Sequence, residues 1–289
     1  MENNALSHHA PTEEGKGGSI GIFDSGYGGL TILHAIRQLL PQYNYIYLAD
    51  NARTPYGTRS YNVVYHFTLQ AVRKLFALNC PLIILACNTA SAKALRTIQQ
   101  RDLPTLAPDR RVLGIIRPTV EALPQLTHNQ HIGILATPGT VHSQSYPIEI
   151  HKFLPQARVT QEPCPMWVPL VENDEHNSPG ADYFIQQHLQ HLLAQDPDID
   201  TILLACTHYP LLLPKIRQHT PPGIQLIPQG NYVAHSLADY LQRHTDIRQQ
   251  LAQHATIQYL TTEDPEKFQQ SAAIFLHQPQ LPTPRHITL

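Results

Sequence analysis

Two cysteines occupy equivalent positions along the chain, each directly after a short apolar run. Cys87 follows residues 82–86, and Cys206 follows residues 201–205. Apolar runs of this length are typical of buried parallel strands. We therefore expect each thiol at the carboxyl end of a strand, where open α/β sheets bind ligands. A thiol suits proton transfer because its neighbours readily move its pKa from about 8.5.

The chain also repeats on a larger scale. Apolar runs at residues 21–23 and 133–136 are separated by nearly the same interval as the two cysteines. Strands and helices alternate, which predicts the α/β class. We therefore expect two similar doubly wound parallel-sheet domains, related by pseudo-symmetry, with the active site in the cleft between them. The expected division is a disordered tail at 1–19, a first domain of 20–113 plus 227–289 and a second domain of 114–226.

A cleft with one thiol on each side suits one task well: removal of a proton from one face of a carbon and return of a proton to the other face. Each thiol then needs an auxiliary group to manage its proton. Asp24 ends the neighbouring strand of the first half, although a carboxylate there fits a helix N-cap equally well. His208 follows Cys206 by two positions, and Glu172 is a candidate for orienting His208.

Small polar residues and glycines accompany these groups. Ser25, Asn88, Thr89 and Thr207 carry hydroxyl or amide groups that suit the ammonium and carboxylates of a substrate. The glycine-rich turn at residues 26–29 favours an anion at a helix start. This turn lacks the spacing of the dinucleotide-binding pattern, which argues against a dinucleotide.

A long connection at residues 51–57 is expected to form a substrate-binding loop. Arg53 in this loop fits two roles, attraction of a substrate carboxylate or pairing with Asp50. The sequence leaves both roles open.

Composition excludes several classes of protein. The net charge is −2 with 18 neutral histidines, and no cluster of lysine and arginine stands out, which argues against a nucleic-acid partner. The apolar runs are too short for a membrane span, and the first nineteen residues lack the apolar segment of a secretory signal. We therefore expect a cytoplasmic protein. Its remaining cysteines, Cys80 and Cys164, are interpreted as core residues without a disulfide.

The second half contains one pair of histidines at helical spacing. His188 and His191 lie three positions apart in a helix expected over residues 181–194. No third ligand is apparent in the sequence, so we interpret the pair as part of a solvated face and expect no metal site. Near the carboxyl end of the chain, residues 256–260 are expected to form an antiparallel strand, and the tail from Gln278 to be irregular.

Five segments together resemble the glutamate racemases, and they occur in that family's order. They are Asp24-Ser-Gly-Tyr-Gly-Gly-Leu30, Pro55-Tyr56-Gly57, Ala86-Cys-Asn-Thr-Ala-Ser-Ala92, Val168-Pro-Leu-Val-Glu172 and Cys206-Thr-His-Tyr-Pro-Leu-Leu212. The resemblance implies a cofactor-independent and metal-independent racemase that interconverts L- and D-glutamate. It also implies that the product supplies bacterial peptidoglycan synthesis, and hence cell wall biogenesis and cell shape.

The resemblance assigns roles by position. Cys87 and Cys206 match the family's two acid/base thiols, and Asp24, Glu172 and His208 match its assisting groups. The implied substrate contacts are Asp24, Ser25, Pro55, Tyr56, Gly57, Asn88, Thr89, Thr137, Thr140, Thr207 and His208. The chain departs from the family's usual residues at Arg117 and Thr119 and at Gln229-Gly230, which concerns interface or hinge details and not the reaction.

Three alternative functions remain at this stage. The nearest is an aspartate or hydantoin racemase of the same superfamily. A second is a binding protein that inhibits DNA gyrase, and a third is a thiol redox or metal protein that uses Cys87 and Cys206. The resemblance also leaves open a homodimer and, because the chain extends at its amino end, activation by a muropeptide precursor.

Overall fold

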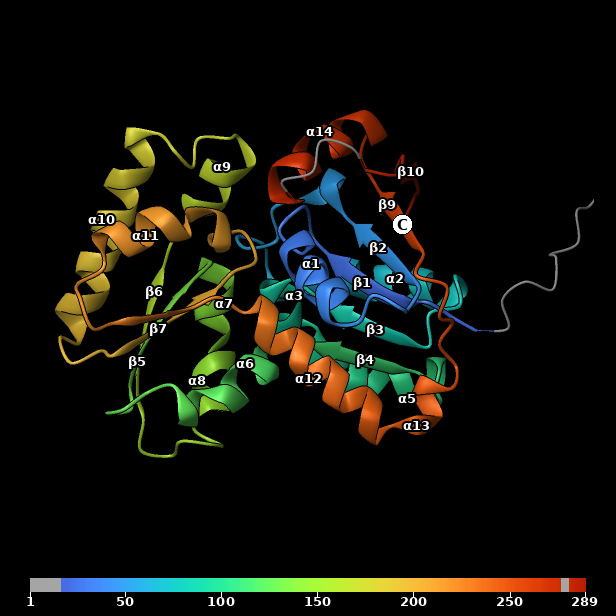
Figure 1. Cartoon of the computed structure of the whole chain (residues 1–289), viewed down its shortest axis with the longest axis horizontal. Coiled ribbons are helices and arrows are strands. Elements are labelled where there is room, and N and C mark those ends of the chain that lie inside the picture. Colours follow the sequence, from blue (N-terminus) through green and yellow to red (C-terminus); the bar gives the residue numbers. More distant parts are fainter. Residues whose placement is uncertain (1–16, 277–280) are drawn as a thin grey trace, which may run out of the picture.

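The computed structural model describes residues 17–276 and 281–289, and these form two α/β halves, each built on its own sheet (Figure 1). The larger sheet has the strand order β10-β9-β2-β1-β3-β4, and every pair of neighbours is parallel. Its strands are β1 Ile20–Asp24, β2 Tyr45–Ala49, β3 Leu82–Leu85, β4 Arg111–Gly114, β9 Ile257–Thr261 and β10 Arg285–His286.

The smaller sheet repeats the central part of this arrangement. Its strands are β5 His131–Ala136, β6 Arg158–Pro163, β7 Thr201–Ala205 and β8 Gln225–Ile227. The order β6-β5-β7-β8 is all parallel, and it matches β2-β1-β3-β4 strand for strand. Cys87 follows β3 and Cys206 follows the equivalent strand β7. The predicted fold of two similar parallel-sheet halves is therefore confirmed.

Helices and short helical turns connect the strands. The α-helices are α1 Leu30–Leu39, α2 Tyr61–Ala77, α3 Asn88–Lys93, α4 Leu95–Thr97, α5 Leu103–Leu106, α6 Ile116–Ala122, α7 Pro138–Ser143, α8 Ser145–Ile150, α9 Trp167–Glu172, α10 Pro179–Gln195, α11 Leu213–His219, α12 Gly230–Arg243, α13 Thr245–Arg248 and α14 Pro265–Leu276. The 3₁₀ and π turns are η1 Asn51–Arg53, η2 Ile98–Asp102, η3 Leu123–Gln125 and η4 Tyr209–Leu212.

The larger sheet is buried on both faces, which explains the unbroken apolar runs of its strands. Ile22 and Ile84 point into the core that contains Leu33 of α1. Phe23 and Leu85, the next residues along the same two strands, point into the opposite core beneath α2. Because successive side chains alternate between faces, a strand covered on both sides needs apolar residues throughout.

The direction expected for the last long strand is wrong. β9 runs parallel to β2, with Tyr259 opposite Tyr47. After leaving the smaller sheet, the chain passes through α12, which packs along α1, and through α13 (Figure 1). This crossover returns the chain to the amino end of the larger sheet, and a parallel strand requires a connection of that length.

The carboxyl-terminal tail needs one correction, and two other segments have local features that affect the site. The tail is not wholly irregular, because Arg285–His286 pairs with β9, while residues 277–280 lie outside the described part. The proline-rich stretch after Cys164 contains the helix α9. Gln144, whose φ is 55°, separates α7 from α8.

The described part of the amino end joins the larger half. The Gly18 amide donates to the Gln250 carbonyl at 2.7 Å, and the Ala252 amide donates to the Gly18 carbonyl at 2.8 Å. Backbone pairing thus begins two residues before β1, while residues 1–16, with His8 and His9, lie outside the described part. The division into domains at residues 113 and 226 stays a prediction.

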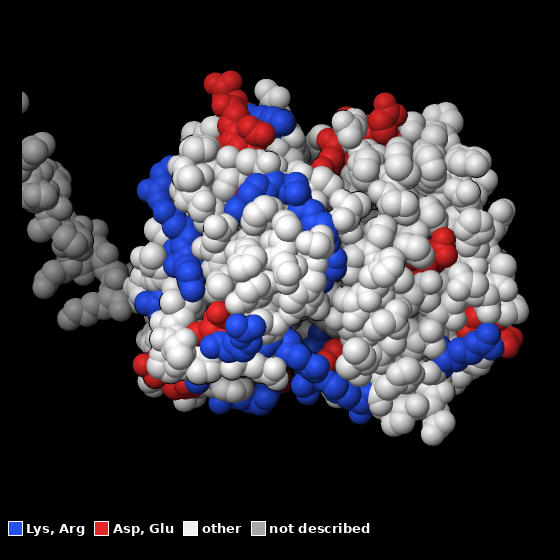
Figure 2. Space-filling view, turned by 180° about the vertical axis from the view of Figure 1, so that it is seen from behind, with Lys and Arg blue, Asp and Glu red and all other residues white. Residues whose placement is uncertain are grey.

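Charged side chains are unevenly spread on the face shown in Figure 2. Lysine and arginine gather mainly over the half that holds the larger sheet, with acidic side chains among them, and much of the other half carries no charge. This face therefore has no uniform charge of one sign. Among the described helices, none combines the length and the apolar character that crossing a membrane requires.

Candidate active site

One cavity lies between the two halves and is lined by both thiols. Cys87 and Cys206 reach it from the carboxyl ends of β3 and β7, and each is 6% exposed. Nine further predicted residues line the same cavity, namely Ser25, Pro55, Tyr56, Gly57, Asn88, Thr89, Thr137, Thr207 and His208. Three predicted residues, Asp24, Thr140 and Glu172, are not part of this lining. The fold thus brings the predicted residues to one place.

Cys87 is a buried thiol at the start of α3. Its Sγ accepts a hydrogen bond from the Ala90 amide at 3.4 Å and lies 3.4 Å from the Ser25 hydroxyl. Burial, together with the negative charge of Asp24, raises the pKa of Cys87 to about 12. The raised pKa favours the thiol form of Cys87 at neutral pH, so Cys87 carries a proton that it can deliver.

Asp24 is fully buried behind Cys87. Its Oδ2 accepts the Gly26 amide at 2.9 Å, while its Oδ1 has no partner among the described residues. Burial raises the pKa of Asp24, and the nearby charge of His208 opposes this rise. The N-cap alternative is wrong, because α1 begins after Gly29 without a side-chain cap.

His208 joins Cys206 to Glu172. Its Nδ1 lies 3.8 Å from Cys206 Sγ, and its Nε2 lies 3.0 Å from Glu172 Oε1. Burial lowers the pKa of His208, but the hydrogen bonds to Cys206 and Glu172 outweigh burial and raise it to about 10. His208 is therefore an imidazolium at neutral pH, and a neighbour of that charge favours the thiolate form of a cysteine.

The glycine-rich turn packs directly against these assisting groups. A Cβ at Gly28 would lie 2.4 Å from His208 Nδ1, and a Cβ at Gly29 would lie 2.6 Å from the Asp24 Cβ. Side chains at these two positions would therefore displace both assisting groups. The glycines are explained by this close approach, which the sequence alone did not reveal, and the anion at this turn stays a prediction.

The loop after β2 carries Tyr56 into the cavity wall. Arg53 Nε lies 2.7 Å from Asp50 Oδ2. Of its two possible roles, the structure therefore supports pairing with Asp50 and not attraction of a substrate carboxylate. The Tyr56 hydroxyl donates to the same carboxylate. The Gly139 amide of the second half donates to the Gly57 carbonyl at 2.7 Å. The loop is thereby held by Asp50 of its own half and by Gly139 of the second half.

Threonines from both halves meet beside this loop. Thr89 Oγ1 lies 3.0 Å from Thr137 Oγ1 and 3.4 Å from Thr140 Oγ1. Thr137 caps α7, where its hydroxyl oxygen accepts the Thr140 amide. Thr140 therefore supports the lining and does not form part of it.

A buried network beneath Asn88 was not predicted to belong to the site. Asn88 Nδ2 donates to Gln229 Oε1 at 2.6 Å, and the Tyr146 hydroxyl donates to Asn88 Oδ1 at 2.6 Å. Gln229 Nε2 donates in turn to the Tyr146 hydroxyl at 2.8 Å and to Thr119 Oγ1 at 3.1 Å. Thr119 and Gln229, noted separately as departures from the family, therefore form one contact that fixes the Asn88 side chain.

Replacing Gln229 with leucine should lower the free energy of unfolding by about 1–3 kcal/mol, because it leaves buried polar groups of Asn88 and Tyr146 without partners. Urea denaturation followed by circular dichroism measures this loss. Gln249→Leu, at an exposed position, serves as the control and should stay within about 0.5 kcal/mol of the parent. Equal stability of the two variants would contradict the role assigned to the network.

The geometry defines a class of protein before any comparison. Two similar α/β halves each present a thiol to one cavity, with an imidazole–carboxylate pair beside one thiol and a carboxyl group beside the other. Such an arrangement suits an acid–base enzyme that reaches both faces of a bound carbon atom. The chain belongs to the Asp/Glu/hydantoin racemase family, whose sequence profile matches residues 30–246.

Individual relatives narrow this assignment. The chain is 37% identical over 271 residues to the glutamate racemase of Paracoccus denitrificans, covering 90% of this chain and 97% of the relative. A glutamate racemase structure from Francisella tularensis, in complex with D-glutamate, is 28% identical with a TM-score of 0.81 and covers 95% of this chain and 97% of its own.

The structure of a third relative contains both a substrate and an activator. The Escherichia coli glutamate racemase, in complex with L-glutamate and the activator UDP-MurNAc-ala, is 26% identical with a TM-score of 0.70. The match covers 89% of this chain and 95% of that chain. All three relatives carry the name glutamate racemase, as the resemblance implied.

Proposed function

We propose that this protein is a glutamate racemase that interconverts L- and D-glutamate by proton transfer between Cα and two thiols. The observation that carries the proposal is that Cys87 and Cys206 line one cavity from equivalent strand ends of the two halves. A substrate held between them would present opposite faces of its Cα to the two sulfur atoms. The glutamate complexes of the Francisella and Escherichia relatives support glutamate as the substrate.

For L-glutamate, Cys206 takes the α-proton and Cys87 delivers its own proton to the opposite face, which gives D-glutamate. The raised pKa values of Cys87 and His208 suit this direction, since they favour a protonated Cys87 and a His208 imidazolium. For D-glutamate the roles reverse: Cys87 first passes its own proton to Asp24 and then, as a thiolate, takes the α-proton. Cys206, protonated by the His208 imidazolium, delivers a proton to the opposite face. Glu172 holds His208 in place in both directions.

The polar residues of the cavity wall are proposed to bind the substrate. Hydroxyl and amide groups of Ser25, Asn88, Thr89 and Thr207 suit the ammonium and carboxylates of glutamate. The remaining proposed contacts are Asp24, Pro55, Tyr56, Gly57, Thr137, Thr140 and His208. Thr140 and Asp24 would act from behind the lining.

No observation favours the alternative functions. A thiol redox or metal protein that uses Cys87 and Cys206 would not account for the match to the racemase family over residues 30–246. An aspartate or hydantoin racemase would share the fold, and a substrate comparison separates it from a glutamate racemase.

The purified protein, without added cofactor, should make the circular dichroism of L-glutamate and of D-glutamate decay to zero. The same assay with L- and D-aspartate should show little decay. Decay with glutamate supports the proposal. Decay with aspartate alone, or with neither amino acid, contradicts it.

The cellular role belongs to the same proposal. D-Glutamate from this reaction would supply peptidoglycan synthesis in the cytoplasm, a reducing compartment that suits four free cysteines. A muropeptide-precursor activator is supported by the Escherichia relative, which was solved with UDP-MurNAc-ala. A homodimer stays a prediction.

A further inference from the structure

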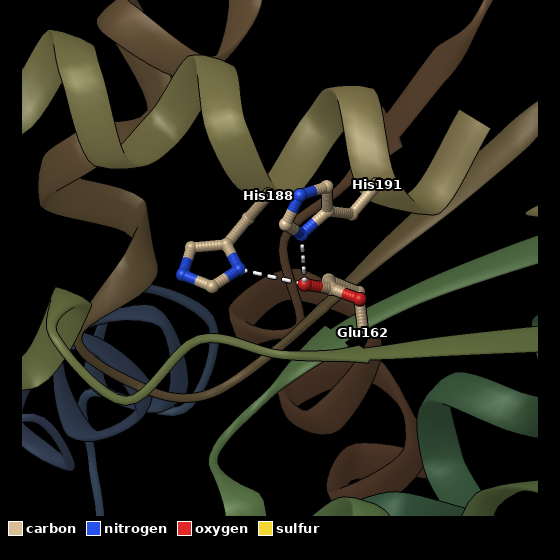
Figure 3. Close-up of side chains that lie close together, drawn as sticks. All are labelled: Glu162, His188 and His191. Atoms are coloured by element: carbon tan, nitrogen blue, oxygen red, sulfur yellow. Dashed lines mark hydrogen bonds and ion pairs between the residues drawn. The ribbon is translucent and has the colours of Figure 1, made fainter. Parts of the chain in front are cut away.

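A cluster of potential metal ligands lies in the second half, outside the cavity. Glu162 comes from β6, and His188 and His191 come from α10, which covers that strand (Figure 3). The Nδ1 atom of His188 lies 2.7 Å from Glu162 Oε1, and that of His191 lies 3.4 Å from the same oxygen. The solvated face expected for this histidine pair holds for His191, which is exposed, and is wrong for His188, which is buried.

The cluster is held in place on one side and open on the other. Gln195 Nε2 donates to Glu162 Oε2 at 3.4 Å, and the ring of His188 meets the ring of Trp167 edge-on at 6.0 Å. The His191 side chain is 57% exposed, whereas those of Glu162 and His188 are 9% and 11% exposed. An ion can therefore reach preassembled ligands from solvent on the His191 side.

We propose that Glu162, His188 and His191 form a binding site for a divalent transition-metal ion such as Zn²⁺ or Ni²⁺. Imidazole nitrogen is a preferred ligand of both ions, and two histidines with one glutamate can bind zinc with a fourth position left to water. The carboxylate supplies a negative charge. Each ring would coordinate through Nδ1 and carry its proton on Nε2.

The distances fit such an ion with a small adjustment. Metal–ligand bonds of about 2.0–2.1 Å in a tetrahedron place ligand atoms about 3.3 Å apart. The present separation of 3.4 Å between His191 Nδ1 and Glu162 Oε1 already matches this spacing. The separation of 2.7 Å at His188 must open by about 0.6 Å, which replaces a hydrogen bond with two bonds to the ion.

A second cluster in the same half shows what distinguishes this site. His131, Asp196 and Asp198 also lie close together. There, however, Arg158 Nε lies 3.3 Å from Asp196 Oδ2, so a guanidinium already occupies the position of a cation. Among the described residues, no lysine or arginine pairs with Glu162. A structural ion pair would need only His188, whereas His191 brings a second nitrogen to the same oxygen.

The single tryptophan of the chain reports on this site directly, because Trp167 packs against His188. We expect Ni²⁺, an open-shell ion, to quench the fluorescence of the full-length protein with saturation. Zn²⁺ has a closed d shell and should not quench but should compete with Ni²⁺. His191→Ala should raise the Ni²⁺ concentration for half quenching by about tenfold or more, since even outer-shell changes cost that much.

His66→Ala is the matched control, because His66 is an exposed histidine on α2 in the other half. It should titrate like the parent, and any contribution from His8 and His9 cancels because all three proteins contain them. His191 is exposed, so its replacement should leave the near-ultraviolet circular dichroism of the fold unchanged. Absence of saturable quenching in the parent, or equal titration of His191→Ala and the parent, would overturn the proposal.

Discussion

Replacing Cys206 with alanine should lower kcat/KM for both enantiomers of glutamate by about 10³-fold, and replacing Cys87 should do the same. The reason is that each direction of the reaction uses one thiol to remove the proton and the other to deliver it. Both thiols line the cavity, and no other sulfur atom of the described residues does. Circular dichroism assays of each variant with L- and D-glutamate measure the loss.

Cys80→Ala is the matched control for these variants. Cys80 is a buried free thiol of the first half, but it lies in the core and not in the cavity wall. Its replacement removes the same atom and should leave racemisation near the parent level. A Cys206→Ala or Cys87→Ala protein that kept more than about a tenth of the parent kcat/KM would contradict the assignment of the two thiols.

Replacing the assisting groups should impair the two half-reactions unequally. His208→Asn removes the imidazolium beside Cys206 and should slow proton removal from L-glutamate by about 10²-fold. Asp24→Asn should slow proton removal from D-glutamate instead, because Asp24 lies behind Cys87. The Haldane relation fixes the ratio of the two steady-state efficiencies, so the asymmetry appears only in single-turnover measurements.

Glu172→Gln provides the matched comparison, since Glu172 acts on Cys206 only through His208. It should slow the same half-reaction as His208→Asn, and by a smaller factor. Single-turnover traces that showed equal slowing of both half-reactions in the His208 and Asp24 variants would argue against this pairing of assisting group and thiol.

The sequence predicted the part of the fold that depends on local pattern. The apolar runs before Cys87 and Cys206 became the buried strands β3 and β7, because strands covered on both faces need apolar residues throughout. The direction of β9 was predicted wrongly, since it depends on the crossover through α12 and not on the residues of the strand.

Site residues that belong to sequence motifs could be predicted. Residues that only the fold brings together could not. The lining groups around Cys87 and Cys206 follow strand ends directly, so their convergence follows from the parallel sheets. Gln229 reaches Asn88 only because α12 starts beneath the cavity. Glu162 likewise meets His188 across a strand and a helix, which no spacing in the sequence indicates.

The most direct test of two-thiol proton transfer is racemisation in deuterium oxide. With Cys87 and Cys206 on opposite sides of the substrate, the proton removed from one face is not the one delivered to the other. The delivering thiol exchanges with solvent before the turnover begins, so nearly every product molecule should carry deuterium at Cα, while substrate recovered at low conversion stays largely protiated. Substantial retention of the original hydrogen in the product at the first turnover would instead indicate a single shuttling base and contradict the mechanism.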